Sequence, residues 1–543
     1  MALVVGRAQH GPALAAARAP EPATHSAPAP PSGPAPRPLL GQTPEQRARV
    51  IALSEQWAPA ITAQDWAAAE RLLRQSLAID PRDHIAHYNL AIALAALGKA
   101  PDAEAALQRA VTLGFTDIAH IERDALLGPL RASVTFRAIL DGWDELQTAV
   151  AADRAALYAK ALGRRYRVTT APELRLMFVT ALSPPSERDL RAQLHAVTRW
   201  WTRAVLPEGT PAVAPGPERP DPWVLVVVPD KDDYQVWARL RFGVGAQDPG
   251  APAQPGSPAP TSTVGGVYDH DTRELVAADA GGLLRHEYAH VLHWRHMART
   301  AKVHPLWVQE GLCSLVEDVS FPPAWDDRDR PPEQDLTPLP SWRTNTARNM
   351  LQSGSLPPLQ GLLALDPQTF LGSRPLGNYA AARSLLLMLD QRGLLGQWYS
   401  RFSQDPRDGT GAAALTAVLN APLTQIERDW RSWIAALEHA PDQSSSPAAQ
   451  LPAALEPTPE GLVVTRAINP PTPPRRSATS LRSPLERSDL LLDIEDQPVR
   501  DRNELARALA DHKPGDALRL RVRRDGQPAE LVAVLIRPTP QEP

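Results

Sequence analysis

Apolar residues recur about every 3.6 positions between residues 45 and 147, a spacing that predicts amphipathic helices paired as antiparallel hairpins. Two stretches in this region, "DWAAAERLLRQSLAIDP" and "APDAEAALQRAVTLGF", are self-similar. They align with Ala69 over Ala103 and Leu73 over Leu107, an offset of 34 residues in both cases. Small alanines suit the close approach of paired helices, so the pattern favours an internal helical repeat over a generic helical hairpin.

A mixed pattern follows between residues 148 and 437. The apolar runs "LRLMFVTAL" and "WVLVVVP" predict strands, and "SERDLRAQLHAVTRWWTRAVL" predicts an amphipathic helix with Ser186 as its N-cap. The stretch "GGVYDHDTRELVAAD" predicts a hairpin that turns at Asp269 to Thr272. Helices are predicted over most of the remainder, so we expect an α+β domain in which a small sheet precedes the helices.

The pattern changes again between residues 452 and 537. In "ALRLRVRRDG", leucine and valine alternate with arginine, which is the period-two sign of a half-buried strand. The dipeptide Asp525-Gly526 that follows is a strong hairpin turn signal. With "GLVVTRAI", "SDLLLDIEDQPV", "RNELARALADHKPGD" and "AELVAVLI", the predicted order is strands, a helix and a final hairpin.

Proline marks the boundaries between these regions. The 58 prolines gather in stretches such as "APEPATHSAPAPPSGPAPRP" and "PGAPAQPGSPAP", which bury too little apolar surface to fold and predict linkers. The chain is expected to divide into a leader (1–44), helical repeats (45–147), a mixed domain (148–437), a linker (438–451), a β-rich domain (452–537) and a tail (538–543), with an insertion at 245–263.

Charge and cysteine content exclude several classes of function. The formal net charge of -4 and the interspersed charges give no basic field for nucleic acid. Cys313 is the only cysteine, so neither an internal disulfide nor a cysteine-built zinc ribbon is available. No apolar run reaches the roughly 18 residues of a transmembrane helix. The leader has a short apolar stretch but lacks a basic region before it, so the sequence gives only weak support for a signal peptide.

The stretch "LRHEYAHVLHWRH" carries the clearest chemistry, because His286, Glu287 and His290 form a His-Glu-x-x-His motif. On a helix the two histidines lie one turn apart on one face, where their imidazoles can occupy adjacent corners of a tetrahedral zinc site. Glu287, on the neighbouring edge, can then reach a metal-bound water. The alternative is a pair of surface histidines without a metal.

Two further histidines follow, but their spacing excludes them as ligands on a straight helix. His296 would lie about 15 Å along the helix axis from His286, and His293 about 10 Å, both beyond a shared coordination sphere. Both are therefore expected on the helix surface or as outer supports of the site. The third ligand is sought in "HPLWVQEGLCSLVED", where Pro305 precedes a second predicted helix. Glu310 on that helix would close a His2Glu site with one position left for water.

These residues resemble the gluzincin zinc metallopeptidases, the thermolysin-like and aminopeptidase-like family with His-Glu-x-x-His, then Trp-x-x-Glu-Gly, then a further glutamate seven residues on. The resemblance implies zinc bound by His286, His290 and Glu310, and Glu287 as general base. It implies that Glu317 orients a histidine. Tyr379, in "GNYAAARSLLLML", matches the tyrosine that donates a hydrogen bond to the oxyanion, with an ordinary helix-start tyrosine as the alternative.

The Gly-x-Met-Glu-Asn signature with which aminopeptidases of this family capture a free amine is missing, and "VGGVYDHD" occupies its place. This departure favours endopeptidase action, with Gly265 to Asp269 as an edge strand along which an extended peptide can pair.

Two flanking resemblances imply protein partners. The 34-residue offset resembles tetratricopeptide repeats, whose concave surface docks partners or packs on a neighbouring domain. Residues 452–537 resemble a bacterial PDZ domain of the kind appended to envelope proteases, which implies peptide capture by strand addition, against a purely structural role. Ser488 stands where that pattern has glycine, and no Gly-Leu-Gly-Phe loop is visible. The combination of a PDZ-like module with a metallopeptidase-like domain implies a location in the bacterial cell envelope.

Three hypotheses follow from the sequence. The first is a zinc-dependent peptidase, in particular an endopeptidase, that acts on a protein or peptide substrate. The second is a metal-bound but catalytically inactive scaffold that binds partners through its repeat and PDZ-like modules. The third is an aminopeptidase. The presence of Glu287, which binds no metal itself, favours the first over the second.

Overall fold

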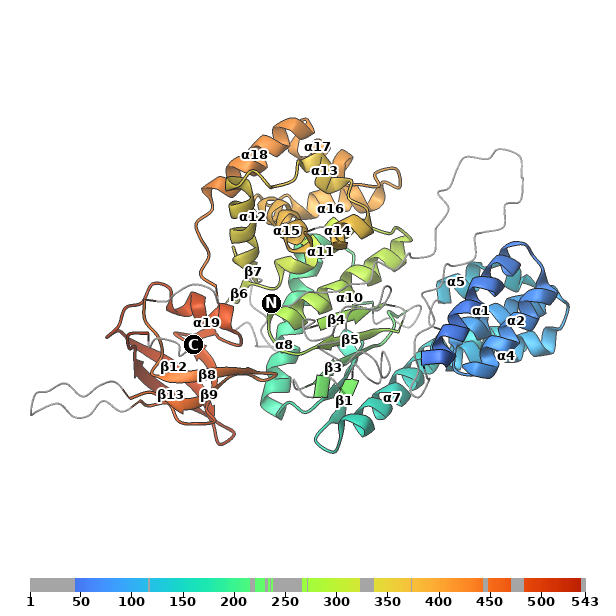
Figure 1. Cartoon of the computed structure of the whole chain (residues 1–543), viewed down its shortest axis with the longest axis horizontal. Helices are drawn as coiled ribbons and strands as arrows, with labels where there is room; N and C mark the ends of the chain where they lie inside the picture. Colours follow the sequence, from blue (N-terminus) through green and yellow to red (C-terminus); the bar gives the residue numbers. More distant parts are fainter. Residues whose placement is uncertain are drawn as a thin grey trace, which may run out of the picture. The chain divides into compact units, whose positions relative to one another are not determined.

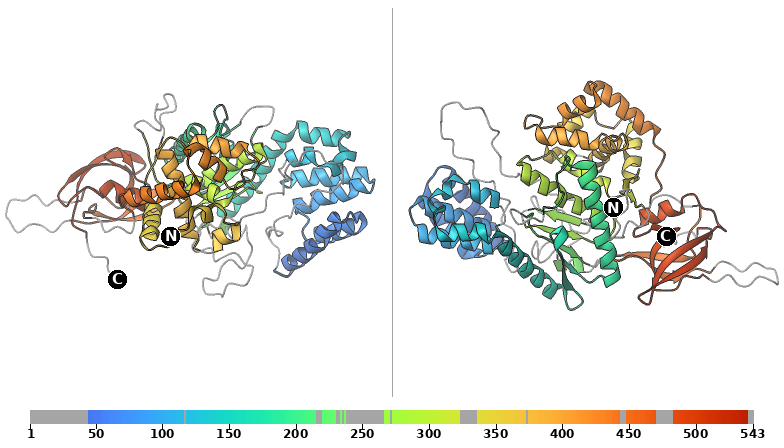
Figure 2. Two further views of the ribbon diagram at one scale, coloured as in Figure 1. Left: turned by 90° about the horizontal axis from the view of Figure 1, so that it is seen from above. Right: turned by 180° about the vertical axis from the view of Figure 1, so that it is seen from behind.

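The computed structural model describes residues 44–115, 118–214, 220–229, 233–234, 236–237, 266–270, 272–322, 336–372, 374–442, 448–469 and 483–538. The leader expected at 1–44, apart from its last residue, and the insertion expected at 245–263 lie outside these residues. The chain forms two compact units, one of Met1–Ala181 with Ala214–Leu275 and one of Leu182–Val213 with Val276–Pro543. Figure 1 labels the helices and strands, and Figure 2 gives two further views in the same colours.

Helices form most of the first unit, as the apolar periodicity predicts. They are α1 (Pro44–Thr62), α2 (Trp66–Ile79), α3 (His84–Ala96), α4 (Ala100–Thr112), α5 (Ile118–Arg123), α6 (Val134–Asp141) and α7 (Trp143–Leu162). Consecutive helices from α1 to α4 pack as hairpins. Ala69 and Ala103 are both fully buried at the contacts, which explains the small residues of the repeat. Asp65 and Asp83 cap α2 and α3 by accepting backbone hydrogen bonds.

A five-stranded sheet has the order β1-β2-β3-β5-β4; strands β1 to β4 belong to the first unit, and β5 ends in the second. The strands are β1 (Arg167–Ala171), β2 (Leu176–Thr180), β3 (Val224–Val228), β4 (Gly266–Asp269) and β5 (Glu274–Ala277). The two apolar runs form β2 and β3, which pair in parallel. Every residue of β2 and β3 is buried, as expected of central strands covered on both faces. The predicted hairpin forms β4 and β5, with β4 at the sheet edge.

The second unit has a helical part that begins with α8. Its helices are α8 (Pro184–Trp200), α10 (Gly282–Thr300), α11 (Leu306–Leu315), α12 (Trp342–Gln352), α13 (Leu359–Leu363), α14 (Pro367–Gly372), α15 (Pro375–Gln391), α16 (Leu395–Gln404), α17 (Ala412–Leu419) and α18 (Leu423–Ala436). A short strand pair, β6 (Val319–Ser320) and β7 (Thr337–Pro338), joins them. The prediction of Ser186 as the N-cap of α8 is wrong. Ser183 caps the helix, and Pro184 supplies the fixed backbone angle favoured at the first helical position.

Helices α11 and α15 approach each other closely at Gly311. A Cβ atom there would lie 2.8 Å from Leu386 Cδ1 and 3.2 Å from the backbone of Ala382. The lack of a side chain beside Glu310 therefore lets the two helices approach this closely without displacing Leu386 or Ala382. The buried face of α15 continues to Tyr379 near its start. The same packing thus brings Glu310 and Tyr379 into one interior.

The last part of the second unit is β-rich, as predicted. Its elements are β8 (Ala453–Thr458), β9 (Gly461–Ala467), β10 (Leu490–Ile494), β11 (Gln497–Pro498), α19 (Arg502–Leu509), β12 (Ala517–Arg524) and β13 (Gln527–Val534). The strands are ordered β13-β12-β10-β9-β8, with β11 beside β10. Leu518, Leu520 and Val522 of β12 are buried, and its arginines alternate with them. Asp525 and Gly526 both have positive φ, at 50° and 79°, which gives the predicted tight turn.

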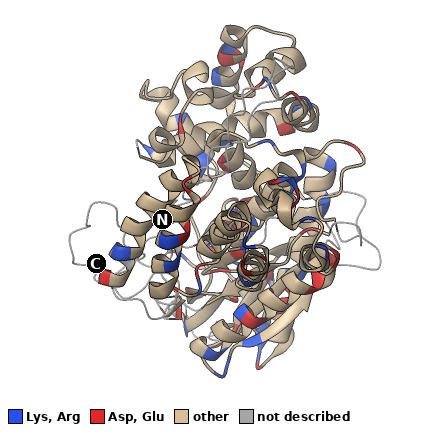
Figure 3. Cartoon of the chain, turned by 90° about the vertical axis from the view of Figure 1, so that its right-hand side faces the viewer, with Lys and Arg blue, Asp and Glu red and all other residues tan. Residues whose placement is uncertain are grey.

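Charged residues are spread over both units. Lys and Arg positions are interspersed with Asp and Glu positions along the helices in Figure 3, in line with the small net charge. Among the described helices, none is both long and apolar enough to span a membrane.

Candidate metal centre

Helices α10 and α11 carry three side chains, His286, His290 and Glu310, whose ligand atoms lie close together. His286 and His290 lie one turn apart on α10, and their Nε2 atoms are 3.1 Å apart. Glu310 Oε2, from α11, lies 3.3 Å from His286 Nε2 and 3.4 Å from His290 Nε2. Among the described residues these three form the group that can hold a metal ion. The structure thus brings together the ligands expected from the sequence.

The size of this triangle fits zinc. Ligand atoms about 2.0–2.1 Å from a tetrahedral zinc ion are separated by about 3.3–3.4 Å, close to the three distances observed. Glu310 Oε2 is buried and faces the Nε2 atoms of both histidines at 3.3 and 3.4 Å. A cation at the centre of the triangle would be a partner for this carboxylate oxygen and for both imidazoles at once. Two imidazoles and one carboxylate also form a donor set that zinc prefers.

The electrostatics of the ligands reflect their mutual contacts. Burial lowers the pKa of His286, but hydrogen bonds to Glu310 and Glu317 outweigh it and raise the pKa to about 10. Burial raises the pKa of Glu310, but the charges and hydrogen bonds of His290 and His286 hold it well below its usual range. Without a metal the site therefore keeps a positive imidazolium beside a negative carboxylate. A divalent cation would take over the role of that proton.

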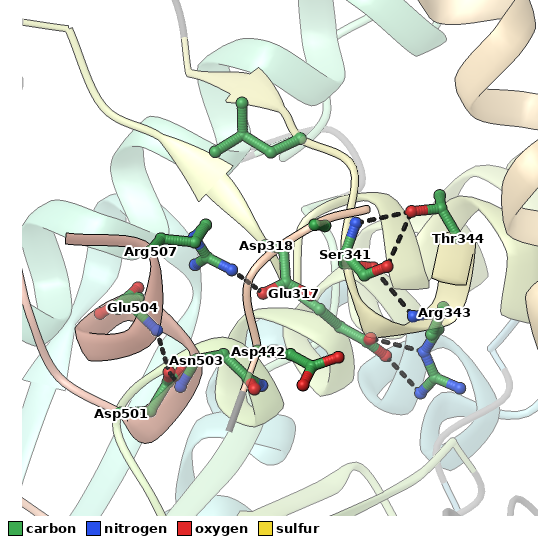
Figure 4. Close-up of polar contacts among 12 residues, drawn as sticks. Glu317, Asp318, Ser341, Arg343, Thr344, Asp442, Asp501, Asn503, Glu504 and Arg507 are labelled. Carbon is green, nitrogen blue, oxygen red and sulfur yellow. Dashed lines mark hydrogen bonds and ion pairs between the residues drawn. The ribbon is translucent and has the colours of Figure 1, made fainter. Parts of the chain in front are cut away.

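Glu317 and Arg343 support His286 from the side away from the triangle. Glu317 Oε1 lies 2.7 Å from His286 Nδ1, which leaves Nε2 for the metal. Arg343, at the start of α12, donates from Nε and Nη2 to the two oxygens of Glu317 at 2.6 and 2.7 Å. This two-point pair fixes the carboxylate plane. Figure 4 shows the pair. The resemblance implied that Glu317 orients a histidine, and in the structure Glu317 lies beside His286. The sequence analysis missed Arg343, for which no motif gives a signal.

Glu287 and Tyr379 lie near the same centre. Glu287 is buried, and its charge contributes to the raised pKa values of His286 and Tyr379. Burial raises the pKa of the Tyr379 hydroxyl well above its usual range, and the charge of Glu310 adds to the increase. The hydroxyl therefore stays protonated. The guanidinium of Arg343 lies 5.1 Å from the centre of the Tyr379 ring.

His293 and His296 are not on the helix surface, contrary to one of the two expectations. Both are buried, at 0% and 3% exposed, because α16 covers this face of α10. His293 Nε2 lies 2.7 Å from His304 Nδ1, and His296 Nδ1 lies 2.8 Å from the Tyr399 hydroxyl. These contacts form a cluster of aromatic rings further along α10, toward its C-terminal end. Neither histidine joins the triangle, as the axial spacing predicts.

This histidine cluster is expected to make stability fall with acidity. Burial lowers the pKa of His293, His304 and His296, to about 4 for His296. The pKa of each of these histidines is lower in the folded than in the unfolded protein, where it is about 6.5. Their contribution to the free energy of unfolding is therefore fully present above pH 6.5 and is lost as the pH falls toward 4. His296 alone would contribute up to about 3 kcal/mol.

Denaturant unfolding, measured as a function of pH with a chelator present, should show this loss of stability. The His296→Gln variant should show a shallower loss and exposed His439→Gln should not, whereas identical curves for all three would contradict the assignment.

Comparisons with known proteins support part of this picture. Residues 60–120 match the family model of the tetratricopeptide repeat. No curated protein matches the chain. A crystal structure of an aminopeptidase N family protein from Idiomarina loihiensis is similar at 12% identity over 69% of this chain and 67% of that chain, with a TM-score of 0.25. A TM-score at this level is too low to assign a fold. The predicted helical repeat is thus confirmed as a tetratricopeptide-like segment within residues 60–120.

Proposed function

We propose that this chain is a zinc-dependent peptidase whose metal is held by His286, His290 and Glu310. The observation that carries the proposal is the triangle of ligand atoms with sides of 3.1, 3.3 and 3.4 Å, with buried Glu287 next to His286 on the same helix. When bound, zinc would lower the pKa of a water ligand toward about 7 and polarise a carbonyl oxygen. Three protein ligands leave the fourth position that such a water needs.

Glu287 is proposed as the general base and acid of the reaction. Its carboxylate would take a proton from the water as the water oxygen bonds to the carbonyl carbon of the substrate. It would return that proton to the leaving nitrogen as the C–N bond breaks. The residue is neither a ligand of the triangle nor on the solvent face of α10. A site that only binds metal has no chemical need for a second buried acid at this position.

Tyr379 and Glu317 are proposed in supporting roles. The raised pKa of Tyr379 keeps its hydroxyl protonated, so it can donate a hydrogen bond to an oxyanion that forms near Glu310. Glu317 would hold His286 in the orientation that directs Nε2 toward the metal. Neither role requires the residue to move.

We further propose endopeptidase action, because the amine-binding signature of the related aminopeptidases is missing from "VGGVYDHD". Unstructured peptides with free and acetylated amino termini are expected to be cleaved with kcat/KM values within about threefold, since an ion pair with the free amine would be worth more than this. Mass spectrometry of the products gives the cleavage sites. A loss of about 100-fold or more on acetylation would instead establish an aminopeptidase.

The tetratricopeptide-like segment favours one other function, a scaffold that binds partners and does not hydrolyse them. Metal analysis of the same purified chain separates the two. Zinc bound at one ion per chain with no cleavage of any peptide would favour the scaffold. Zinc together with cleavage would establish the peptidase.

We also infer that the β-rich segment from β8 to β13 is PDZ-like. Its support is the order of strands around a single helix, α19, and the closing hairpin of β12 and β13. One face of α19 is occupied by contacts with the helical part of the same unit.

A further inference from the structure

Helix α19 contacts the helical part of its unit through charged side chains that are mostly buried. Arg285, from α10, donates from Nη2 to Glu504 Oε1 at 3.1 Å, and their side chains are 0% and 5% exposed. Arg507, one turn further along α19, donates from Nη1 to Asp318 Oδ1, and the Asp318 side chain is 4% exposed. Figure 4 shows Glu504, Arg507 and Asp318 at this contact. Buried pairs of this kind leave an uncompensated charge when one partner is removed.

Arg500 strengthens the same contact. It lies just before α19 and donates from Nε and Nη2 to the two oxygens of Asp189 on α8, at 3.0 and 3.1 Å. Its backbone N–H donates to Glu504 Oε2 at 2.7 Å, which fixes the carboxylate that meets Arg285. The ring of Phe321 lies 5.1 Å from Arg500 Cζ and 5.6 Å from Arg285 Cζ. Two arginines from different parts of the chain therefore meet on one aromatic ring.

Arg285 also holds the backbone that carries Glu317. It donates from Nε to the Val316 carbonyl at 2.9 Å and from Nη2 to the Glu317 carbonyl at 2.7 Å. The start of α10 touches the same backbone, because a Cβ atom on Gly282 would lie 2.6 Å from the Glu317 carbonyl oxygen. The segment therefore has no room to shift toward α10. Its position is set by Arg285 on one side and by Arg507 through Asp318 on the other.

The side chain of Glu317 extends from this backbone segment toward the metal ligands. It reaches His286 Nδ1 at 2.7 Å and is paired with Arg343. The following residue, Asp318, accepts a hydrogen bond through its carbonyl from Leu339 N at 2.9 Å, ahead of α12. The His286–Glu317 contact is thus linked to the ion pairs of α19 through the backbone of Glu317 and Asp318. A shift of this backbone by a few tenths of an ångström would move the carboxylate that orients a metal ligand.

We propose that Arg507 and Glu504 of α19 are positioning residues of the metal centre, acting through Asp318, Arg285 and the backbone of Glu317 on His286. The inference rests on the proposed function in that it assumes a metal at His286, His290 and Glu310. It assigns the β-rich segment a part in the site itself. Removal of the α19 ion pairs then loosens the metal centre, without loss of any ligand.

The test compares two arginine-to-glutamine variants of the full chain. Arg507→Gln removes the pair with buried Asp318. The matched control Arg521→Gln removes the pair between Arg521 of β12, whose side chain is 56% exposed, and Asp493 of β10. Zinc affinity is measured by competition with a chelating dye, and the ligand geometry by the visible absorption of the cobalt-substituted protein. We expect Arg507→Gln to weaken zinc binding about tenfold and to change the cobalt spectrum, as outer-support mutations do. Arg521→Gln should leave both unchanged.

A charge-preserving variant and a second site sharpen the test. Arg507→Lys should recover part of the zinc affinity, because it keeps a cation beside Asp318. If Arg507→Gln does not fold, Glu504→Gln, which keeps the shape of the side chain, gives the same readouts. A lower unfolding temperature with wild-type zinc affinity and cobalt spectrum would overturn the inference and leave the proposed function intact. A wild-type chain that binds neither zinc nor cobalt would overturn both.

Discussion

Replacement of Glu287 by glutamine is expected to lower kcat for peptide cleavage by about 100- to 10,000-fold while zinc stays bound at one ion per chain. The amide has nearly the size of the carboxylate, so the buried position next to His286 stays filled. It cannot accept a proton from water at neutral pH, however. The measurement pairs metal analysis of the purified variant with initial rates of cleavage on the peptides that the wild-type chain hydrolyses.

A matched control for this variant is Glu427→Gln, which removes only an ion pair between Glu427 and Arg431 on α18. Such a pair contributes little to stability, and the variant should keep both zinc and activity. Full activity in Glu287→Gln would rule out this residue as the base. Loss of zinc in the same variant would show that its role is to stabilise the site rather than to transfer a proton.

Replacement of Glu310 by alanine is expected to remove bound zinc and to abolish cleavage. The carboxylate supplies one of three ligand atoms and lies within 3.4 Å of both histidines. Its loss leaves two imidazoles, which hold zinc far more weakly at neutral pH. We expect zinc affinity to fall by more than about 100-fold in chelator competition, beyond the 10- to 100-fold typical of outer supports. Zinc retained at wild-type affinity would refute the assignment of this ligand.

The two replacements distinguish the residue that binds zinc from the residue that transfers the proton. Glu310→Ala should lose metal and activity together, and the metal-free protein should not recover on addition of micromolar zinc. Glu287→Gln should lose activity alone. A circular dichroism spectrum identical to wild type is the control for folding of Glu310→Ala, since this variant also removes the buried partner of His286.

Local patterns in the sequence predicted the elements that depend on short-range rules. The alternation of apolar and charged residues predicted which side of β12 is buried, and Asp525-Gly526 predicted the turn that follows it. The spacing of His286 and His290 gave their common face on α10. The N-cap of α8 was misplaced by three residues, although Pro184 and Pro185 already favour a helix that starts directly after Ser183.

Long-range contacts explain what the sequence did not reveal. His293 and His296 were expected on the helix surface or in support of the site because their distance along the helix from His286 excludes them as ligands. Their burial comes from Tyr399, more than one hundred residues away along the chain. Arg343 lies in no motif, and its pairing with Glu317 depends on the packing of α12. The contact of α19 with Arg285 spans an even larger separation in sequence.

Adjacent positions on α10 thus serve two parts of the chain, since Arg285 meets α19 and the next residue, His286, meets the metal ligands. A lineage that lost the C-terminal segment would leave the Arg285 cation buried without the Glu504 carboxylate, and selection would favour a neutral residue in its place. Arg285 and α19 are therefore expected to be inherited together or lost together, while the His-Glu-x-x-His motif persists in both branches. In a related sequence, an arginine at the position before the motif would then indicate that the β-rich segment is present, and a neutral residue that it is absent.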